Sequence, residues 1–355
     1  MISPARQVAF DILRRVHDGG YASDLLLRRS AQLDSRDAGL ASEIVFGCLR
    51  YQAQLDYLIG RRVPRAPATE VLIALRMGIY QLRYLDRIPP HAAVGESVEL
   101  VKRAHKTEAA GLVNAILRKT DRTPVPWPDR ATKLSMPAWL VEKWDRQYGR
   151  DTTDQIASGF LEPAQTYIAS TGRTQDIGAQ SIVPLLDLRP GETFLDLCAA
   201  PGNKTAQAIQ QGARAIACDI HLHRLKQMGD LNCPLVVLDG TQPLPFRTNS
   251  DRVLFDRILV DAPCSGTGTL GRNPEIKWRL KPSDLADLHA KQVALVRQAL
   301  RHLRPGGRLV YSTCSLEREE NELVIQEVPA AWQITERLPG LNAGDGFFAA
   351  VCSAT

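Results

Sequence analysis

Apolar residues recur at helical spacing through the first third of the chain. Val8, Ile12 and Val16 lie four positions apart, after a Ser3-Pro4 pair that is typical of a helix N-terminus. The same spacing returns over residues 24–32, 37–58, 68–84 and 92–119, the last with a break near residue 106. Because no strand-like alternation interrupts these stretches, the pattern predicts an all-helical domain over residues 1–122.

The pattern changes after three closely spaced prolines, Pro124, Pro126 and Pro128, which predict a stiff linker over residues 123–136. Two helices are expected at 137–148 and 152–160, followed by a short extended piece at 166–170. These elements define a connecting region over residues 137–178.

From residue 179 onward, apolar strands alternate with helices. Strands are predicted at 194–197, 213–218, 235–238, 257–260 and 309–312, with a last, antiparallel strand at 346–351. Helices are predicted at 181–186, after residue 204, at 222–231 and at 283–303. This alternation indicates βαβ units, and residues 179–355 are therefore predicted to form a Rossmann-like α/β domain with a mostly parallel sheet.

Positive charge is concentrated in the helical part. Residues 1–130 hold 20 Lys and Arg against 14 Asp and Glu, whereas the remainder holds 24 against 25. The excess suits an anionic partner such as RNA, although a solvated helical surface is an equally good interpretation. Two basic clusters are candidate phosphate contacts: Arg61, Arg62 and Arg65, and Lys102, Arg103 and Lys106.

The seven cysteines form no CxxC pair and show no zinc spacing. This usage predicts a reducing, cytoplasmic location, with no metal site and no disulfide framework. The sequence opens with no signal-peptide pattern, and no apolar run approaches the roughly 20 residues of a membrane span. We therefore expect no membrane association, and we expect a monomer.

Acidic residues follow three consecutive predicted strands. Asp219, Asp239 and Asp261 each end an apolar run, and the loop after the first strand, residues 198–204, is rich in small residues. One such acid is most often a helix cap, but three at neighbouring strand ends favour a nucleotide site. Asp219 is placed to accept from ribose hydroxyls and Asp239 from an adenine amine. A phosphate-binding lysine–serine pair is missing from the loop, which disfavours ATP hydrolysis.

Two cysteines also end predicted strands, Cys264 after Asp261 and Cys314 after residues 309–312. A thiolate is a strong nucleophile that can add to carbon 6 of a pyrimidine and so activate carbon 5 toward a methyl group. A second thiol could then help to eliminate the first. The other five cysteines lie in apolar surroundings, where a free thiol is usually a small hydrophobe.

The motifs that carry these residues resemble the RsmB/Nop2/NSUN (Sun/Fmu) family of RNA 5-methylcytosine methyltransferases. They are Leu195-Asp-Leu-Cys-Ala-Ala-Pro-Gly-Asn-Lys-Thr205, Asp261-Ala-Pro-Cys-Ser-Gly-Thr-Gly268, Asn273-Pro-Glu-Ile-Lys-Trp278, Tyr311-Ser-Thr-Cys-Ser315 with Glu319-Glu-Asn321, and Asp345-Gly-Phe-Phe348. The N-terminal part resembles a NusB-like RNA-binding domain at residues 5–15, 21–26 and 46–51. Together these features are similar to the RsmB-like branch, which modifies small-subunit (16S) ribosomal RNA.

The resemblance implies S-adenosyl-L-methionine as cofactor and RNA, here small-subunit ribosomal RNA, as partner. Cys314 would be the nucleophile, and Cys264 would assist release of the product. The implied cofactor-binding residues are Cys198, Ala199, Ala200, Pro201, Gly202, Asn203, Lys204, Asp219, Asp239 and Asp261. Lys204 and Asp261 would also orient the cytosine, and Arg272 and Trp278 would line the RNA side.

Two features depart from the family pattern. Asn203 stands where a second glycine is usual, and Asn tolerates positive φ better than most residues. The RNA-guiding insert within residues 137–178 is shortened. Three alternatives remain: a DNA cytosine methyltransferase with Cys264 as nucleophile, methylation of another RNA such as tRNA, and a non-catalytic RNA-binding protein with a relic methyltransferase domain.

Overall fold

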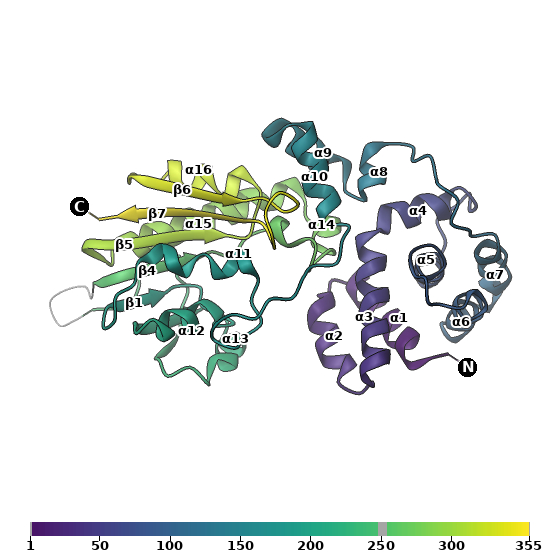
Figure 1. Ribbon diagram of the computed structural model, residues 1–355, viewed down its shortest axis with the longest axis horizontal. Coiled ribbons are helices and arrows are strands. Elements are labelled where there is room, and N and C mark those ends of the chain that lie inside the picture. Colours follow the sequence, from purple (N-terminus) through teal and green to yellow (C-terminus); the bar gives the residue numbers. More distant parts are fainter. Residues whose placement is uncertain (1, 248–253, 355) are drawn as a thin grey trace. The chain divides into compact units, whose positions relative to one another are not determined.

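The computed structural model describes residues 2–247 and 254–354, which form two compact units (Figure 1). The first unit comprises Met1–Pro163 together with Leu270–Arg279, and the second comprises Ala164–Thr269 together with Leu280–Thr355. The segment Leu270–Arg279 thus belongs to the first unit, although in the sequence it lies between the two parts of the second unit. The connecting region predicted at residues 137–178 is divided between the two units.

The first unit is helical, as predicted. Its helices are α1 (Pro4–His17), α2 (Ala22–Ser30), α3 (Ser35–Arg50), α4 (Gln52–Gly60), α5 (Thr69–Tyr84), α6 (Pro90–Arg103), η1 (Thr107–Ala109), α7 (Ala110–Arg118), α8 (Arg130–Leu134), α9 (Ala138–Tyr148), α10 (Arg150–Gly159) and α14 (Ile276–Arg279). The helix predicted at 37–58 is two helices that meet at Tyr51, whose φ of −97° and ψ of 16° leave the helical region. The apolar faces of α1, α3 and α5 form the core, around Ile44, Leu75 and Met77.

The segment Leu270–Arg279 is held in the first unit by polar anchors. Buried Glu275 accepts a 2.8 Å hydrogen bond from the Ala22 backbone N–H. Lys277 donates to the carbonyl of Arg50 at 2.9 Å, and the Trp278 indole donates to that of Leu49 at 2.8 Å. The segment therefore satisfies backbone groups at the start of α2 and the end of α3, which lack partners within their own helices.

The second unit contains a seven-stranded sheet in the order β3-β2-β1-β4-β5-β7-β6 (Figure 1). The strands are β1 (Thr193–Asp196), β2 (Arg214–Asp219), β3 (Leu235–Val237), β4 (Phe255–Asp261), β5 (Leu303–Thr313), β6 (Trp332–Arg337) and β7 (Phe347–Ser353). The first five are parallel, and β7 runs antiparallel to both of its neighbours. The predicted fold class is confirmed, but β6 was not predicted, because four of its six residues are exposed.

Both faces of this sheet are covered. Ile258 and Val260 of β4 pack with α15, whereas Leu259 between them packs with residues of η2 and α12, as the alternation of a strand requires. The covering elements are α11 (Ile177–Gln180), η2 (Val183–Leu186), α12 (Asn203–Gln210), α13 (Leu222–Leu225), η3 (Lys226–Met228), η4 (Thr267–Thr269), α15 (Pro282–Leu300), η5 (Arg318–Glu320) and α16 (Glu322–Gln326). The helix predicted at 181–186 is the shorter 3₁₀ helix η2, and the one predicted at 222–231 is the short α13 followed by the 3₁₀ helix η3.

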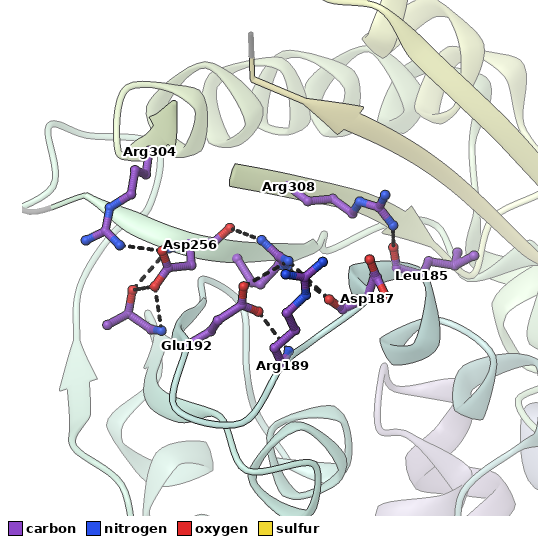
Figure 2. A network of polar contacts seen from close by, with 9 residues as sticks. Leu185, Asp187, Arg189, Glu192, Asp256, Arg304 and Arg308 are labelled. Atoms are coloured by element: carbon purple, nitrogen blue, oxygen red, sulfur yellow. Dashed lines mark hydrogen bonds and ion pairs between the residues drawn. The ribbon is translucent and has the colours of Figure 1, made fainter. Parts of the chain in front are cut away.

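A polar network fastens the amino-terminal ends of β1, β4 and β5 (Figure 2). Arg257 pairs with Glu192 at 3.0 Å and donates to the Asp187 carbonyl at 3.1 Å. Asp256 accepts from the Thr193 backbone at 2.9 Å and pairs with Arg304. These contacts fix the strands at one edge of the sheet, so that their carboxyl ends at the other edge stay in register.

Candidate active site

The carboxyl ends of β1, β2, β3, β4 and β5 surround a cavity of about 570 Å³. Its lining includes five predicted cofactor residues, Cys198, Ala200, Asp219, Asp239 and Asp261, and both predicted catalytic residues, Cys264 and Cys314. The volume lies within the range of small-molecule and cofactor sites. The remaining lining residues are Leu197, Ile220, His221, Arg224, Leu238, Gly240, Thr241, Ala262, Pro263, Leu288, Lys291 and Leu295.

The loop between β1 and α12 forms one wall. Its backbone is tied to β2 by a 2.7 Å hydrogen bond from Ala199 N–H to the Cys218 carbonyl. Gly202 adopts a φ of +97°, and a Cβ there would lie 2.9 Å from Met228. Asn203 instead begins α12, and its amide donates to the Thr174 carbonyl at 3.0 Å. The positive φ of this turn falls on Gly202 and not on Asn203, so an asparagine in place of the usual glycine leaves the turn intact. The asparagine side chain also adds a hydrogen bond to Thr174.

Two strand-end acids lie on the cavity wall with their carboxylates partly engaged. One oxygen of Asp219 accepts from the His221 backbone at 2.9 Å, and the other lies 3.6 Å from Arg224. Asp239 accepts from the backbone and the hydroxyl of Thr241 at 2.9 and 2.7 Å. The hydrogen bonds from Thr241 lower the pKa of Asp239, so this carboxylate is ionised at neutral pH.

The third acid, Asp261, is held between two partners. Lys204 of α12 contacts one of its oxygens at 2.6 Å, and the Ser312 hydroxyl of β5 donates to the other at 2.8 Å. Burial alone would lower the pKa of Lys204, but the ion pair with Asp261 outweighs burial and raises it. Lys204 therefore keeps its charge and orients the carboxylate; the lysine itself lies outside the cavity lining.

The two predicted catalytic thiols meet at the cavity. The register of β4 with β5 pairs Asp261 with Ser312, so Cys264 and Cys314 follow at the same edge. Their Sγ atoms are 3.4 Å apart, within hydrogen-bond reach. The hydrogen bond to Cys314, together with burial, raises the pKa of Cys264 well above its usual value. Cys264 therefore keeps its proton at neutral pH.

Several lining residues escaped the sequence analysis. Ile220 follows Asp219, and Leu238 precedes Asp239. An apolar residue next to each of these two acids could therefore have been predicted to line the cavity. Lys291 of α15 reaches the cavity from a distant helix, and no local pattern marks it. Arg272 and Trp278, predicted to line the RNA side, belong to the first unit.

Another residue that the sequence analysis passed over is Asp196 at the end of β1. It is fully buried, and it accepts a 2.7 Å hydrogen bond from Thr205. Burial raises its pKa to about 7, against the effect of that hydrogen bond.

Among residues 2–247 and 254–354, no group of His, Cys, Asp and Glu is placed to hold a metal ion. In the same ranges no helix is long and apolar enough to cross a membrane.

Comparisons with known proteins agree with this arrangement. The 16S rRNA methyltransferase RsmB/F family model matches residues 183–337, and the NusB family model matches residues 3–122. A probable ribosomal RNA small subunit methyltransferase B of Bacillus subtilis is 30% identical, over 90% of this chain and 87% of that protein. The ribosomal RNA small subunit methyltransferase B of Thermus thermophilus is 34% identical, over 90% of this chain and 86% of its own.

Solved structures show the same fold. The crystal structure of the protein PH0851 covers 99% of both chains with a TM-score of 0.80 at 20% identity. A methyltransferase homologue from Pyrococcus horikoshii covers 63% of this chain and 97% of its own, with a TM-score of 0.53 at 23% identity. The cofactor is S-adenosyl-L-methionine, and the cavity fits it, with a close backbone turn at Gly202 and two strand-end carboxylates. The chain belongs to the RsmB/F family of methyltransferases and carries a NusB-family domain in its N-terminal part.

Proposed function

We propose that the protein methylates carbon 5 of a cytosine in small-subunit (16S) ribosomal RNA through a covalent adduct with Cys314. The observation that carries the proposal is the pair of thiols 3.4 Å apart on the wall of the cofactor cavity. One thiol suffices for addition to a pyrimidine, and a second at contact distance suits its later expulsion. The relatives named as ribosomal RNA small subunit methyltransferases support the choice of RNA.

In this mechanism the Cys314 thiolate forms a bond to carbon 6 of the cytosine, which makes carbon 5 nucleophilic. S-adenosyl-L-methionine supplies the methyl group that carbon 5 takes up. A water molecule then takes the proton from carbon 5, the bond between carbon 6 and Cys314 breaks with its electron pair going to sulfur, and 5-methylcytosine is released. Cys264 assists this last step, because its retained proton can pass to the departing sulfur of Cys314. A base within paired RNA must first leave its stack.

The Lys204–Asp261 pair is proposed to orient the base. The carboxylate of Asp261 lines the cavity on the strand that leads to Cys264, and it can accept from the exocyclic amine of cytosine. Lys204 and Ser312 hold its two oxygens in fixed positions. A carboxylate held in this way discriminates cytosine from uracil, since uracil presents a carbonyl at the same place.

The helical part is proposed to bind the RNA. Its N-terminal excess of positive charge provides a surface for phosphates, and Arg61 and Arg65 are both exposed. Arg62 donates to the backbone of Lys119 at 2.8 Å, and Lys102 pairs with Glu99 at 2.7 Å. Arg61, Arg65 and the equally exposed Arg103 are therefore the phosphate contacts that we favour within the two predicted clusters.

Bisulfite mapping of ribosomal RNA from cells with and without the protein tests the proposal. We expect one or a few cytosines of small-subunit RNA to lose bisulfite protection when the protein is absent and to regain it when the protein is restored. Transfer of radiolabelled methyl groups to purified small-subunit RNA, tRNA and DNA separates the alternatives. Label in DNA or tRNA alone would contradict the ribosomal assignment. Failure to bind S-adenosyl-L-methionine in calorimetry would favour a non-catalytic protein.

A further inference from the structure

A buried carboxylate lies behind the two thiols. Glu320 of η5 has no exposed surface, and its two oxygens accept four hydrogen bonds. Oε1 accepts from the Ser265 backbone N–H at 2.8 Å and from the Gln292 amide at 3.0 Å. Oε2 accepts from the Ser265 hydroxyl at 2.5 Å and from the Ser315 hydroxyl.

The donors are the residues that follow the thiols. Ser265 is the next residue after Cys264, and Ser315 is the next residue after Cys314. One carboxylate therefore holds both cysteine-bearing loops, and in each loop it binds the residue next to the cysteine. We call Glu320, Ser265 and Ser315 the carboxylate clamp. The two serine oxygens also lie 3.1 Å from each other, within hydrogen-bond distance, so all three side chains of the clamp contact one another.

Other bonds tie the clamp to its surroundings. The amide of Gln292 on α15 donates to the Pro263 carbonyl at 2.9 Å, and Gly268 N–H donates to the Cys314 carbonyl at the same distance. The Thr267 hydroxyl adds a further tie, since it accepts from the Leu316 backbone N–H at 2.9 Å. A buried carboxylate is costly to desolvate, so its four converging donors offset a penalty that a neutral side chain would not incur.

We propose that Glu320 is a positioning residue that sets the separation of the Cys264 and Cys314 thiols, a role that rests on the proposed two-thiol function. Transfer of a proton between two sulfurs requires direct contact, and displacement by an ångström can cost about 100-fold in rate. Ser265, Ser315 and Glu320 are not among the residues that line the cavity. Loss of the clamp should therefore lower kcat while the KM for S-adenosyl-L-methionine stays unchanged.

The thiol separation can be measured without any methylation. A diazene oxidant such as diamide takes two electrons and two protons from a pair of thiols, which forms the S–S bond and reduces the diazene to a hydrazine. Mass spectrometry of the peptides then gives the rate of Cys264–Cys314 disulfide formation. The full-length parent would be compared with Glu320→Ala, Glu320→Gln, Ser265→Ala and Ser315→Ala. Ser181→Ala is the matched control, since it also loses one serine hydrogen bond, of 2.6 Å, in the second unit.

We expect Glu320→Ala to slow disulfide formation and kcat by about 100-fold each. Each serine variant should show a smaller loss in both rates, and Ser181→Ala none. Glu320→Gln should remain close to the parent, because serine hydroxyls can accept from an amide as well as donate to a carboxylate. The serine variants keep the test valid if Glu320→Ala does not fold.

Wild-type disulfide rates in folded Glu320→Ala, or in both serine variants, would overturn the positioning role. A Glu320→Gln variant as impaired as Glu320→Ala would also overturn it, because the negative charge would then be what matters. If the clamp variants slow disulfide formation but the parent transfers no methyl group to RNA, the clamp is supported and the proposed function fails. These two failures are therefore distinguishable.

Discussion

The sulfur atoms of Cys264 and Cys314 are 3.4 Å apart, although fifty positions separate the two residues along the chain. Two parallel neighbouring strands, β4 and β5, bring them together at one sheet edge. The hydrogen bond between the two thiols and burial raise the pKa of Cys264, so this thiol keeps its proton at neutral pH. A protonated thiol beside Cys314 suits the release step that we propose for Cys264.

Replacement of the proposed nucleophile should remove the reaction but not the cofactor. Cys314→Ala is expected to lower kcat by about 10⁴-fold or more, as for other deleted nucleophiles. Affinity for S-adenosyl-L-methionine, measured by calorimetry, should change little because the strand-end acids stay in place. Cys233→Ala, which alters a half-buried thiol that does not line the cavity, is the control. Wild-type methylation by Cys314→Ala would refute the assignment.

Replacement of the second thiol should halt the reaction later. In Cys264→Ala, Cys314 can still add to carbon 6, but its departure loses the proton that Cys264 retains. We expect a covalent protein–RNA adduct, visible as a slowly migrating band in a denaturing gel that nuclease treatment removes. The double variant with Cys314→Ala should form no adduct. A Cys264→Ala protein that turns over without any adduct would rule out the release role.

Lys277 should make the stability of the first unit depend on pH. Burial, with a smaller effect of Arg50, lowers the pKa of Lys277 from 10.5 to about 7. Between these two values the unfolded state binds a proton that the native state lacks, so stability should rise as pH rises from about 7 to 10.5. Below pH 7 the native state also binds the proton and holds a buried ammonium group, so the free energy of unfolding no longer changes with pH through Lys277.

Urea unfolding at a series of pH values from 7 to 10.5 measures this effect through the loss of helical signal. Lys277→Met should flatten the rise in midpoint, whereas Lys119→Met, which alters an exposed lysine of the same unit, should leave it unchanged. Equal pH slopes in the parent and Lys277→Met would show that this lysine does not carry the effect.

Gly268 should not tolerate a side chain. A Cβ at this position would lie 2.4 Å from the Gly346 carbonyl oxygen and 2.8 Å from that of Cys314, and both are backbone atoms. Gly268→Ala is expected to cost about 1–3 kcal/mol in the free energy of unfolding and to lower kcat by displacing the Cys314 loop. Gly39→Ala on α3, where the added methyl meets nothing within 4 Å, is the control. Unchanged activity and stability in Gly268→Ala would contradict this close approach.

The sequence predicts the sheet and the site edge where local signals agree with the fold. Apolar runs that end in Asp219 and Asp261 mark strands and their carboxyl ends together, since a buried strand must be apolar and the residue after it reaches the edge. Exposed strands are harder to predict: Ile334 of β6 is 53% exposed, and its neighbours carry no alternating pattern of burial.

Long-range polar partners could not be predicted. Glu320 and Glu319 read alike in the sequence, and only the fold shows that Glu320 receives four donors in the core. Lys277 likewise has a backbone carbonyl as its partner, which no pattern of side chains can indicate. Residue types and strand ends therefore predict which residues line the cavity. The buried polar residues that support those lining residues can be identified only from the folded structure.

The place of Leu270–Arg279 within the first unit has a consequence for biosynthesis. The ribosome makes a chain from its N-terminus, and α1 to α10 emerge before this segment exists. Until residue 279 has left the exit tunnel, the Ala22 N–H and the Leu49 and Arg50 carbonyls have only water as a substitute for their final partners. The nascent helical bundle is therefore completed only after translation has passed both Asp261 and Cys264.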